Sequence, residues 1–460
     1  MDWILSSARV GAALALMAAY VALCAGIAWR QRQRSQAARR EQQQLQAGSG
    51  HGPAVLVAYA SQTGQAEALA HESARVLHEA GCAVRLMSLQ EITQADLRAC
   101  AHSLWVVATC GEGDAPDQAL GFVRRMLDKP LDLEGHEAHV LALGDREYVQ
   151  FCAFGLRVQA WLEAQKAQTA MLCMSNMDEA VLRSWREAVG GLVQRLTGRQ
   201  ADAWTEPEPE RLWVLQRRQR LNPGSQGGAV YLLDWVPESG ALPTWESGDL
   251  VSLCVESDPE RPRDYSIANV SSDGCLQLLV RQSTRADGTP GLASDWLCTG
   301  LEEGGRLALR LRAHSGFRLG DNAHRPLILI GNGTGLAGLC SHIKARVARG
   351  CADQWLVFGE RHPEHDALLD AQLQQWLAQG QLARLDRAWS RHAQTPGYVQ
   401  HVLAAEAGRL KSWVERGAAI YVCGSQQGMA QAVDQLLREL LGSEPLDALA
   451  LQGRYRRDVY

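Results

Sequence analysis

Apolar and polar positions alternate in blocks along most of the chain. Between residues 53 and 198, helical patterns follow apolar runs that predict buried parallel strands, at 54–60, 104–110 and 139–144. The helical stretches lie near 65–79, 118–127, 152–166 and 178–196. This alternation predicts a doubly wound α/β sheet, whose ligands bind beyond the carboxyl ends of the strands.

The second half of the chain changes pattern twice. Short apolar runs punctuated by Gly and Pro over 211–312 predict a small antiparallel β-barrel. From residue 327 the strand–helix alternation returns, with strand ends expected within 327–338, 355–361, 383–391 and 418–424. The fold class expected is therefore α/β and β, with two α/β units flanking a barrel.

The N-terminus carries an uncharged stretch, Val10 to Trp29, between Arg9 and Arg30. Twenty residues in a helix span about 30 Å, which matches the hydrocarbon core of a bilayer. Arginines follow the stretch, so the positive-inside rule predicts a single-pass membrane protein with its soluble domains in the cytoplasm, in a bacterial inner membrane. A cleaved signal peptide, a lipoprotein site at Cys24 and a buried core helix are the alternatives.

Composition adds limits on function. The chain has 460 residues, 46% of them hydrophobic and 21% charged, which predicts two to four globular domains. A net charge of -5 gives no basic field for nucleic acid. The 12 cysteines form no CxxC pair, so we expect reduced thiols in the cytosol rather than a disulfide scaffold. The histidine pairs 136/139 and 362/365 lack a third ligand in evident reach, and no metal site is expected.

These patterns divide the chain into six segments. We predict a transmembrane anchor at 1–30, a polar Gln-rich tether at 31–52, a doubly wound α/β domain at 53–198, a linker at 199–210, a β-barrel at 211–322 and a second α/β domain at 323–460. The loops at the strand ends indicate what these domains bind.

Three loops of the first unit have the composition of a ligand site. Ser61–Gly64 precedes a helix, where hydroxyl and backbone N–H groups suit a phosphate, although an ordinary capped helix start has the same residues. The loops 110–114 and 144–152 are glycine-containing, and Tyr148 offers a ring for stacking or is a plain surface aromatic.

In the second half, an Arg-Asp-Tyr-Ser strand (263–266) and the helix start 291–294 offer a cation, a ring and a second anion site. Gly331, Gly333 and Gly335 suit a pyrophosphate at a helix N-terminus, although such a glycine pattern alone is weak.

Taken together, these motifs resemble a known family. Residues 59–70, 108–119 and 142–155 are similar to the FMN-binding flavodoxin domain of diflavin reductases. The ordered set from 263 to 460, which includes RDYSIA, GLAS, FRL, GNGTGLAG, FGER, YVCG and RRDVY, resembles the ferredoxin–NADP reductase module, most closely that of sulfite reductase flavoprotein and NADPH–hemoprotein reductases.

The resemblance implies a flavodoxin-like FMN-binding domain at 53–198, a FAD-binding barrel at 211–322 and an NADP-binding domain at 323–460. It also implies site residues for each cofactor. For FMN it implies Ser61, Gln62, Thr63, Gly64, Gln65, Ala66, Cys110, Gly111, Glu112, Gly113, Gly144, Asp145, Tyr148, Phe151 and Cys152. For FAD it implies Arg263, Asp264, Tyr265, Ser266, Gly291, Leu292, Ala293, Ser294 and Tyr460, and for NADPH it implies Gly333, Thr334, Gly335, Ser390, Arg391, Tyr398 and Gln400. Ser266, Cys423, Asp458 and Tyr460 match the family's catalytic cluster beside the flavin.

The chain also departs from the family. Cys110 stands where many relatives have an aromatic residue, so Tyr148 is expected to be the main stacking ring. Pro396 stands where relatives often have a lysine. Only RPRDYS separates residues 250–260 from the FAD strand, which leaves no room for the helical connecting insertion.

The resemblance implies a membrane-anchored reductase that passes electrons from NADPH to FAD, to FMN and on to a one-electron acceptor, such as a hemoprotein or another membrane-associated redox protein. One alternative is direct reduction of ferric iron, quinone or another small acceptor. A sulfite reductase flavoprotein subunit is a further alternative, and a tethered docking subunit that has lost FMN is the last.

Overall fold

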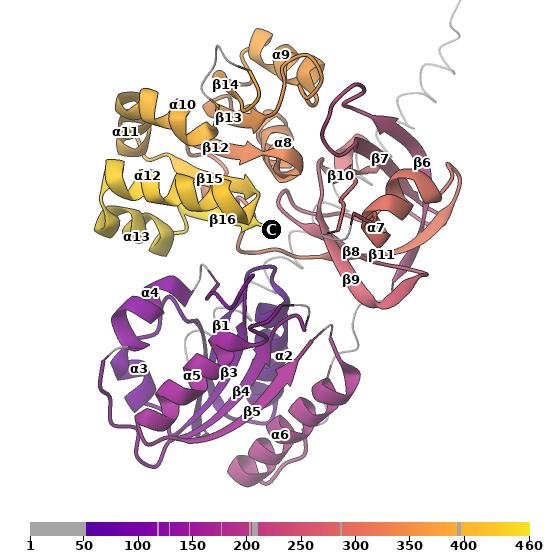
Figure 1. Cartoon of the computed structure of the whole chain (residues 1–460). Helices are drawn as coiled ribbons and strands as arrows, with labels where there is room; N and C mark the ends of the chain where they lie inside the picture. The colour runs from indigo at the N-terminus through magenta and orange to yellow at the C-terminus, as the bar shows by residue number, and fades with distance from the viewer. Residues whose placement is uncertain are drawn as a thin grey trace, which may run out of the picture.

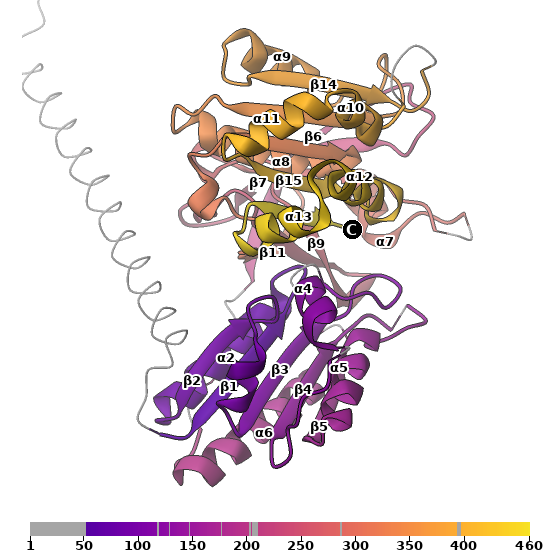
Figure 2. The same cartoon turned by 90° about the vertical axis from the view of Figure 1, so that its left-hand side faces the viewer.

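The computed structural model describes residues 52–460 except 117–118, 128, 147, 176, 202–203, 205–209, 286–287 and 393–396. Three β-sheets organise this part of the chain, and each consists of consecutive strands. Figure 1 and Figure 2 show the first sheet below the other two, with the C-terminus at the junction between them.

The first sheet has five parallel strands in the order β2-β1-β3-β4-β5, which confirms the predicted flavodoxin-like unit. The strands are β1 (Ala54–Ala60), β2 (Ala83–Ser88), β3 (His102–Ala108), β4 (Glu137–Leu143) and β5 (Gln168–Met174). The helices are α2 (Gln65–Glu79), α3 (Gln94–Arg98), α4 (Leu120–Phe122), α5 (Ala153–Ala164) and α6 (Glu179–Thr197). The helical stretch predicted near 118–127 consists of α4 followed directly by a π-helical turn at Val123–Leu127.

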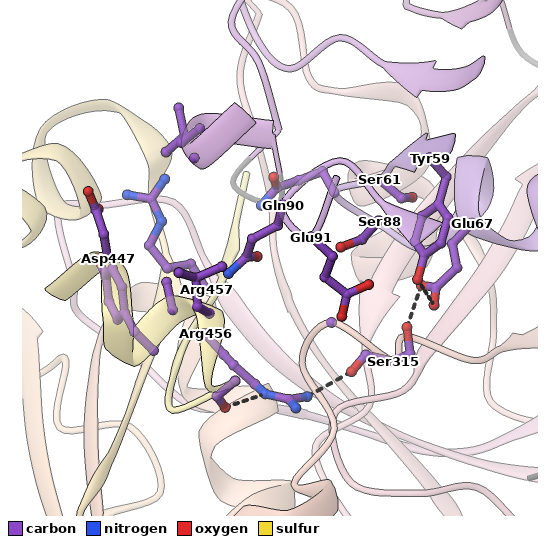
Figure 3. A pocket seen from close by; sticks show the side chains of 18 of the residues that line it. Tyr59, Ser61, Glu67, Ser88, Gln90, Glu91, Ser315, Asp447, Arg456 and Arg457 are labelled. Carbon is purple, nitrogen blue, oxygen red and sulfur yellow. Dashed lines mark hydrogen bonds between the residues drawn. The ribbon is translucent and has the colours of Figure 1, made fainter. Parts of the chain in front are cut away.

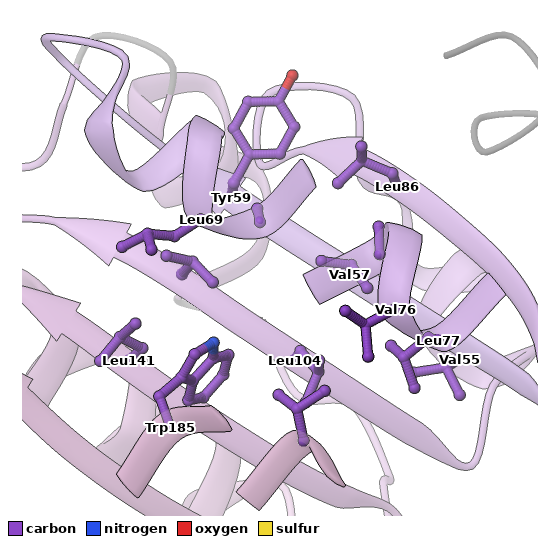
Figure 4. Packing of buried hydrophobic residues seen from close by; sticks show 14 of the residues in the cluster. Val55, Val57, Tyr59, Leu69, Val76, Leu77, Leu86, Leu104, Leu141 and Trp185 are labelled. Carbon is purple, nitrogen blue, oxygen red and sulfur yellow. The ribbon is translucent and has the colours of Figure 1, made fainter. Parts of the chain in front are cut away.

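Strand alternation gives this sheet two apolar faces. Odd-numbered β1 residues, Val55 and Val57, pack with α2 and α6 around Trp185 (Figure 4), whereas Leu56 and Ala58 face a second core with α4 and α5. Trp185 Nε1 donates to Ser73 Oγ at 3.0 Å, so the buried indole N–H between α6 and α2 is satisfied. Burial on both faces leaves the strand ends as the open edge of the unit.

The second sheet is the predicted antiparallel barrel. Its six strands run in the order β10-β7-β6-β11-β8-β9, and a bridge between Ile267 and Leu278 joins the two ends of the sheet. The strands are β6 (Arg211–Arg220), β7 (Val230–Pro237), β8 (Leu250–Val255), β9 (Asp258–Ser266), β10 (Leu276–Arg281) and β11 (Arg306–Arg312). Val255 pairs directly with Asp258, so a tight hairpin stands where the connecting insertion has no room.

The third sheet is parallel, in the order β14-β13-β12-β15-β16. Its strands are β12 (Leu327–Asn332), β13 (Gln354–Glu360), β14 (Arg384–Trp389), β15 (Ala419–Gly424) and β16 (Tyr455–Val459). Its helices are α8 (Leu336–Val347), α9 (Asp370–Ala378), α10 (Val399–Ala405), α11 (Ala407–Glu415), α12 (Gln431–Leu441) and α13 (Ser443–Leu451). The barrel and this sheet together match the predicted ferredoxin–NADP reductase-like module.

The predicted membrane localisation is corrected. Within residues 52–460, leaving out the gaps given above, no helix has both the length and the apolar character needed to cross a bilayer. The longest of the helices described, α6, has 19 residues and carries arginines and glutamates along one side, as a sheet-covering helix does. The anchor predicted at 1–30 and nearly all of the tether predicted at 31–52 lie outside the described residues, and a single-pass membrane location is not retained.

Candidate functional site

The loop between β1 and α2 forms a turn that requires glycine. Gly64 has φ +82°, and a Cβ there would lie 2.8 Å from the carbonyl oxygen of Ala313. Gly64 caps α2, so the loop presents backbone N–H groups at a helix N-terminus, where a phosphate binds well. The predicted phosphate residues Ser61–Ala66 are therefore together in one turn, and Ser61 and Ala66 are buried.

The loops after β3 and β4 lie against each other. Cys110 and Asp114 exchange backbone hydrogen bonds of 2.9 and 2.8 Å, which closes the first loop into a tight turn. A Cβ on Gly113 (φ +107°) would lie 2.6 Å from Gln150 of the second loop. The first of these loops also comes within reach of the phosphate turn, because Cys110 Sγ lies 3.7 Å from Gln62 Oε1. The glycines thus leave backbone open for a flat ligand, as FMN binding requires.

The tyrosine and the two cysteines of the predicted FMN loops differ in how far their side chains can reach a flavin. Tyr148 is 42% exposed, so its side chain is partly accessible at the predicted FMN loop. Cys152 is fully buried, and its thiol donates to the carbonyl of Ala142 at 3.3 Å. The Cys152 side chain therefore faces the sheet, and only its backbone lies in the predicted FMN loop. Burial raises the pKa of Cys110 to about 12, so this thiol stays neutral beside the loop.

The C-terminal end of the chain closes the space above these loops. A cavity of about 260 Å³ is lined by Gln62, Cys110 and Asp114 from the first unit and by Gln426 and Arg457 from the third. Gln426 N donates to the main-chain oxygen of Tyr460 at 3.0 Å, and the side-chain oxygen of Gln426 lies 3.2 Å from where a Cβ on Gly111 would stand. The predicted FMN loops and the C-terminal tyrosine are neighbours through this one glutamine.

The four predicted catalytic residues meet at the junction of the barrel and the third sheet. Cys423 and Asp458 are register partners on β15 and β16. Ser266 Oγ, at the end of β9, donates to Asp458 Oδ2 at 2.9 Å, and Cys423 Sγ lies 3.6 Å from the same oxygen. Tyr460 follows two residues after Asp458 and is 58% exposed, with its hydroxyl 3.1 Å from Thr334 Oγ1.

Electrostatics fix the protonation of this cluster. Burial and the adjacent Asp458 carboxylate raise the pKa of the Cys423 thiol well above its ordinary value. Cys423 therefore remains a neutral S–H donor at physiological pH, and it points its proton toward Asp458. One buried carboxylate that accepts from a hydroxyl and a thiol is suited to stabilise positive charge that develops beside it.

The remaining FAD candidates occupy two parts of the barrel. Arg263 pairs with Asp258 at 3.1 Å, and Asp264 pairs with Arg312. Burial raises the pKa of Tyr265, which packs against the barrel core. Ser294 Oγ accepts from Ser283 N at 3.0 Å, behind a glycine whose Cβ would stand 2.1 Å from Ser283 Oγ. The turn 291–294 is thus a backbone cradle with no space for a side chain at its first position, which fits a pyrophosphate.

Most of the predicted NADPH residues line one cavity of about 560 Å³. Of the predicted set, the residues that line it are Gly333, Thr334, Ser390, Tyr398 and Gln400, together with Tyr460. Gln400 Oε1 is buried and has no hydrogen-bond partner, so it can accept from a ligand. Gly335 lies behind the turn, where a Cβ would stand 2.1 Å from the carbonyl oxygen of Cys423, and Arg391 lies outside the lining residues.

Sequence analysis missed one charged pair in this cavity. Arg281, at the end of β10, forms an ion pair with Glu360, at the end of β13. Burial raises the pKa of Glu360, while Arg281 opposes that shift. Arg281 Nη2 lies 3.5 Å from where a Cβ on Gly333 would stand, so the guanidinium faces the glycine turn. No local sequence pattern indicates this ion pair, because Arg281 and Glu360 belong to different sheets.

A further cavity, of about 300 Å³, lies between the first unit and the C-terminal strands and helices (Figure 3). Tyr59, Glu67 and Glu91 line it from the first unit, and Arg456 and Arg457 line it from β16. It shares Ser61 and Gln62 with the predicted phosphate turn. The cavity therefore lies at the interface between the first unit and the C-terminal part of the chain, next to the predicted phosphate turn.

Comparison with known proteins agrees with this arrangement. Residues 57–213 match the flavodoxin family, and residues 329–435 match the oxidoreductase NAD-binding domain. The chain is similar to the sulfite reductase [NADPH] flavoprotein alpha-component of Bacillus subtilis (strain 168), at 25% identity over 88% of this chain and 89% of the relative. It is similar to the same component of Serratia proteamaculans (strain 568) at 36% identity over 44% of this chain and 36% of the relative.

A third relative, the alpha-component of Vibrio cholerae serotype O1 (strain ATCC 39315 / El Tor Inaba N16961), is 26% identical over 88% of this chain and 87% of its own length. The alignment with the Bacillus subtilis relative extends over 540 residues, more than the 460 of this chain. That relative therefore carries residues that have no counterpart here, as expected of a chain without the connecting insertion.

A flavodoxin-like sheet joined to a barrel and a nucleotide-binding sheet, with glycine cradles at each set of strand ends, defines a flavoprotein oxidoreductase with two flavin sites. The two family matches and the relatives support a place for this chain in the diflavin reductase family. The chain is an NADPH-dependent flavoprotein reductase, and its cofactors are FMN, FAD and NADPH.

Proposed function

We propose that the protein takes electrons from NADPH and delivers them, by way of FAD and then FMN, to a hemoprotein that accepts one electron at a time. The observation that carries this proposal is the short connection between the two flavin sites. Gln426 bonds to Tyr460, the predicted FAD cover, and its side chain meets the FMN loop at Gly111. The relatives are named as flavoprotein alpha-components of sulfite reductase, which favours another component of such an enzyme as the acceptor.

Each group of residues has a role in this proposal. The turn Ser61–Ala66 and the loops 110–114 and 144–152 would hold FMN, and Arg263, Tyr265 and the turn 291–294 would hold FAD. The nicotinamide and the flavins supply the hydride and one-electron chemistry when they are bound. Asp458 stabilises the charge that hydride loss leaves on the nicotinamide, while Ser266 and Cys423 orient it. Tyr460 shields the site and moves aside for the nucleotide.

The proposal includes the domain boundaries 53–198, 211–322 and 323–460. Residues 390, 391 and 398 would recognise the 2′-phosphate of NADPH, supported by the position of Ser390 and Tyr398 on the nucleotide cavity. Arg281 would contact the pyrophosphate from the barrel side, since it faces the Gly333 turn.

A count of released flavins is the direct test. The purified chain is expected to release about one FMN and one FAD, and to reduce cytochrome c with NADPH. Removal of FMN by mild salt treatment is expected to stop cytochrome c reduction while NADPH still reduces FAD. Release of FAD alone, or cytochrome c reduction that is unaffected by FMN removal, would refute the relay. Electron delivery to a sulfite reductase hemoprotein then tests the acceptor.

A further inference from the structure

The barrel side of the molecule contacts the predicted FMN phosphate turn directly. Arg312, the last residue of β11, donates from Nη2 to the carbonyl of Thr63 at 2.8 Å and to its hydroxyl at 3.4 Å. His314 Nε2 lies 2.9 Å from the carbonyl oxygen of Gln62, and Ser315 Oγ donates to Glu67. Three side chains from residues 312–315 thus bind the turn and the first turn of α2.

This segment is already ordered by its own side of the molecule. Asp249, which is buried, accepts from His314 N at 3.0 Å and from Arg318 Nε at 2.6 Å. Phe317 is fully buried in the core of the third sheet, and Arg456 donates to the carbonyls of residues 315 and 318 at 2.8 Å each. The segment therefore presents its side chains without an ordering cost at the moment of contact.

Arg312 and His314 bind carbonyl oxygens of peptide groups whose N–H groups belong to the predicted phosphate turn. The carbonyl of Thr63 shares a peptide group with the N–H of Gly64, and the carbonyl of Gln62 shares one with the N–H of Thr63. A cationic donor on the carbonyl polarises the peptide and makes its N–H a stronger donor to an anion. A phosphate held by those N–H groups and a guanidinium on the carbonyl therefore strengthen each other's hydrogen bonds.

Arg312 also connects the two flavin sites. Its Nη1 pairs with Asp264 on the predicted FAD strand, while its Nη2 binds the FMN turn. The pair with Asp264 fixes the guanidinium in place, since both faces of its fork are engaged. A tight hairpin joins β8 and β9, where the resemblance places the missing connecting insertion, and the Arg312 contacts link the flavodoxin-like sheet to the barrel.

We propose that Arg312 is a positioning residue of the FMN site. It binds the phosphate turn from the barrel side, so that FMN binding and docking of the flavodoxin-like sheet stabilise each other. The proposal rests on the proposed function, because it takes the turn 61–66 to be the FMN phosphate site. Linkage requires the effect to be reciprocal, so loss of the Arg312 contact must weaken the binding of the phosphate-bearing flavin.

The test compares two flavins on the full chain after FMN removal, with FAD retained. FMN carries the phosphate and riboflavin lacks it, and quenching of flavin fluorescence measures the Kd of each. Arg312→Gln is expected to weaken FMN binding by about five- to tenfold, within the range of couplings between linked sites, and to leave riboflavin binding unchanged. Arg312→Lys is expected to keep part of the effect, because it retains the charge but not the fork.

The matched control is Arg306→Gln. Arg306 lies on the same strand, is 67% exposed and pairs at 2.8 Å with Glu238, away from the turn. It is expected to change neither Kd. Equal weakening of FMN and riboflavin by Arg312→Gln, or no change in either, would overturn the proposal. If the wild-type chain binds no FMN at all, it is the proposed function that fails, which the wild-type titration reveals before any variant is compared.

Discussion

Ser266 and Asp458 lie 192 residues apart in the chain, yet Ser266 Oγ donates to Asp458 Oδ2 at 2.9 Å. Their hydrogen bond joins the end of barrel strand β9 to the last strand of the nucleotide-binding sheet. Cys423 reaches the same carboxylate oxygen from the neighbouring strand. The proposed catalytic cluster thus forms only when the two sheets pack together, and one buried carboxylate is its centre.

The first prediction concerns that carboxylate. Asp458→Asn keeps the size and the hydrogen-bond acceptor but removes the negative charge, so it is expected to slow FAD reduction by NADPH about 100-fold, as the loss of one preorganised electrostatic contact does. Stopped-flow absorbance at saturating NADPH measures the rate. FAD content is expected to be unchanged, and Ser266→Ala is expected to have a smaller effect. A wild-type rate in Asp458→Asn would contradict the role given to the charge.

A second prediction concerns the pair that sequence analysis missed. Arg281→Gln is expected to weaken NADP⁺ binding by about 10- to 100-fold, because a hydrogen bond to a charged group contributes about 1.5–3 kcal/mol. Isothermal titration of the FAD-loaded chain measures the Kd. The single variant leaves Glu360 buried without its partner, so the matched control is the double variant Arg281→Gln/Glu360→Gln, which restores neutrality. If the double variant binds as tightly as the wild type, Arg281 acts only by neutralising Glu360.

Features formed by residues adjacent in the chain could be predicted from the sequence. The glycine turns at 61–66, 291–294 and 333–335 could be predicted, because each consists of adjacent residues before a helix. Strands β2 and β5 were not identified. β5 begins with two polar residues and is mostly exposed or half-buried, and β2 alternates buried with half-buried positions at the edge of the sheet.

Contacts between units could not be predicted in the same way. Arg312 and Thr63 are 249 residues apart, and Arg281 and Glu360 belong to different sheets. Nothing in the local pattern of either residue indicates its partner. The four positions of the proposed catalytic cluster came only from the resemblance, and the register of β15 and β16 places two of them, Cys423 and Asp458, side by side.

A third prediction follows from the buried thiols. Burial raises the pKa of Cys423 well above its ordinary value and that of Cys340 to about 12, so neither is a thiolate at pH 8. Iodoacetamide, which reacts with thiolates, is expected to leave both unmodified after an hour in the folded chain and to label both in urea. Peptide mass spectrometry measures the labelled fraction at each site. Rapid labelling of Cys423 at pH 8 in the folded chain would show that the site is open to water.

The last prediction concerns His342, whose ring lies 5.0 Å from Phe317 and 4.8 Å from Tyr421. Burial lowers the pKa of His342 to about 3, with Arg456 adding to the effect, and neither ring nitrogen has a hydrogen-bond partner. The unfolded chain takes up this proton near pH 6.5 and the folded chain does not. Stability is therefore fully present above pH 6.5 and is lost as the pH falls from 6.5 toward 3.

At pH 5 the neutral ring is expected to cost about 2 kcal/mol of unfolding free energy relative to pH 7, at about 1.4 kcal/mol per pH unit. His342→Phe removes the titrating group but keeps a ring against Phe317 and Tyr421, so its stability is expected to fall less between pH 7 and pH 5. Urea unfolding at the two pH values measures the difference, and His401→Gln, at an exposed imidazole, is the control. An equal loss of stability in wild type and His342→Phe would mean that the acid sensitivity has another source.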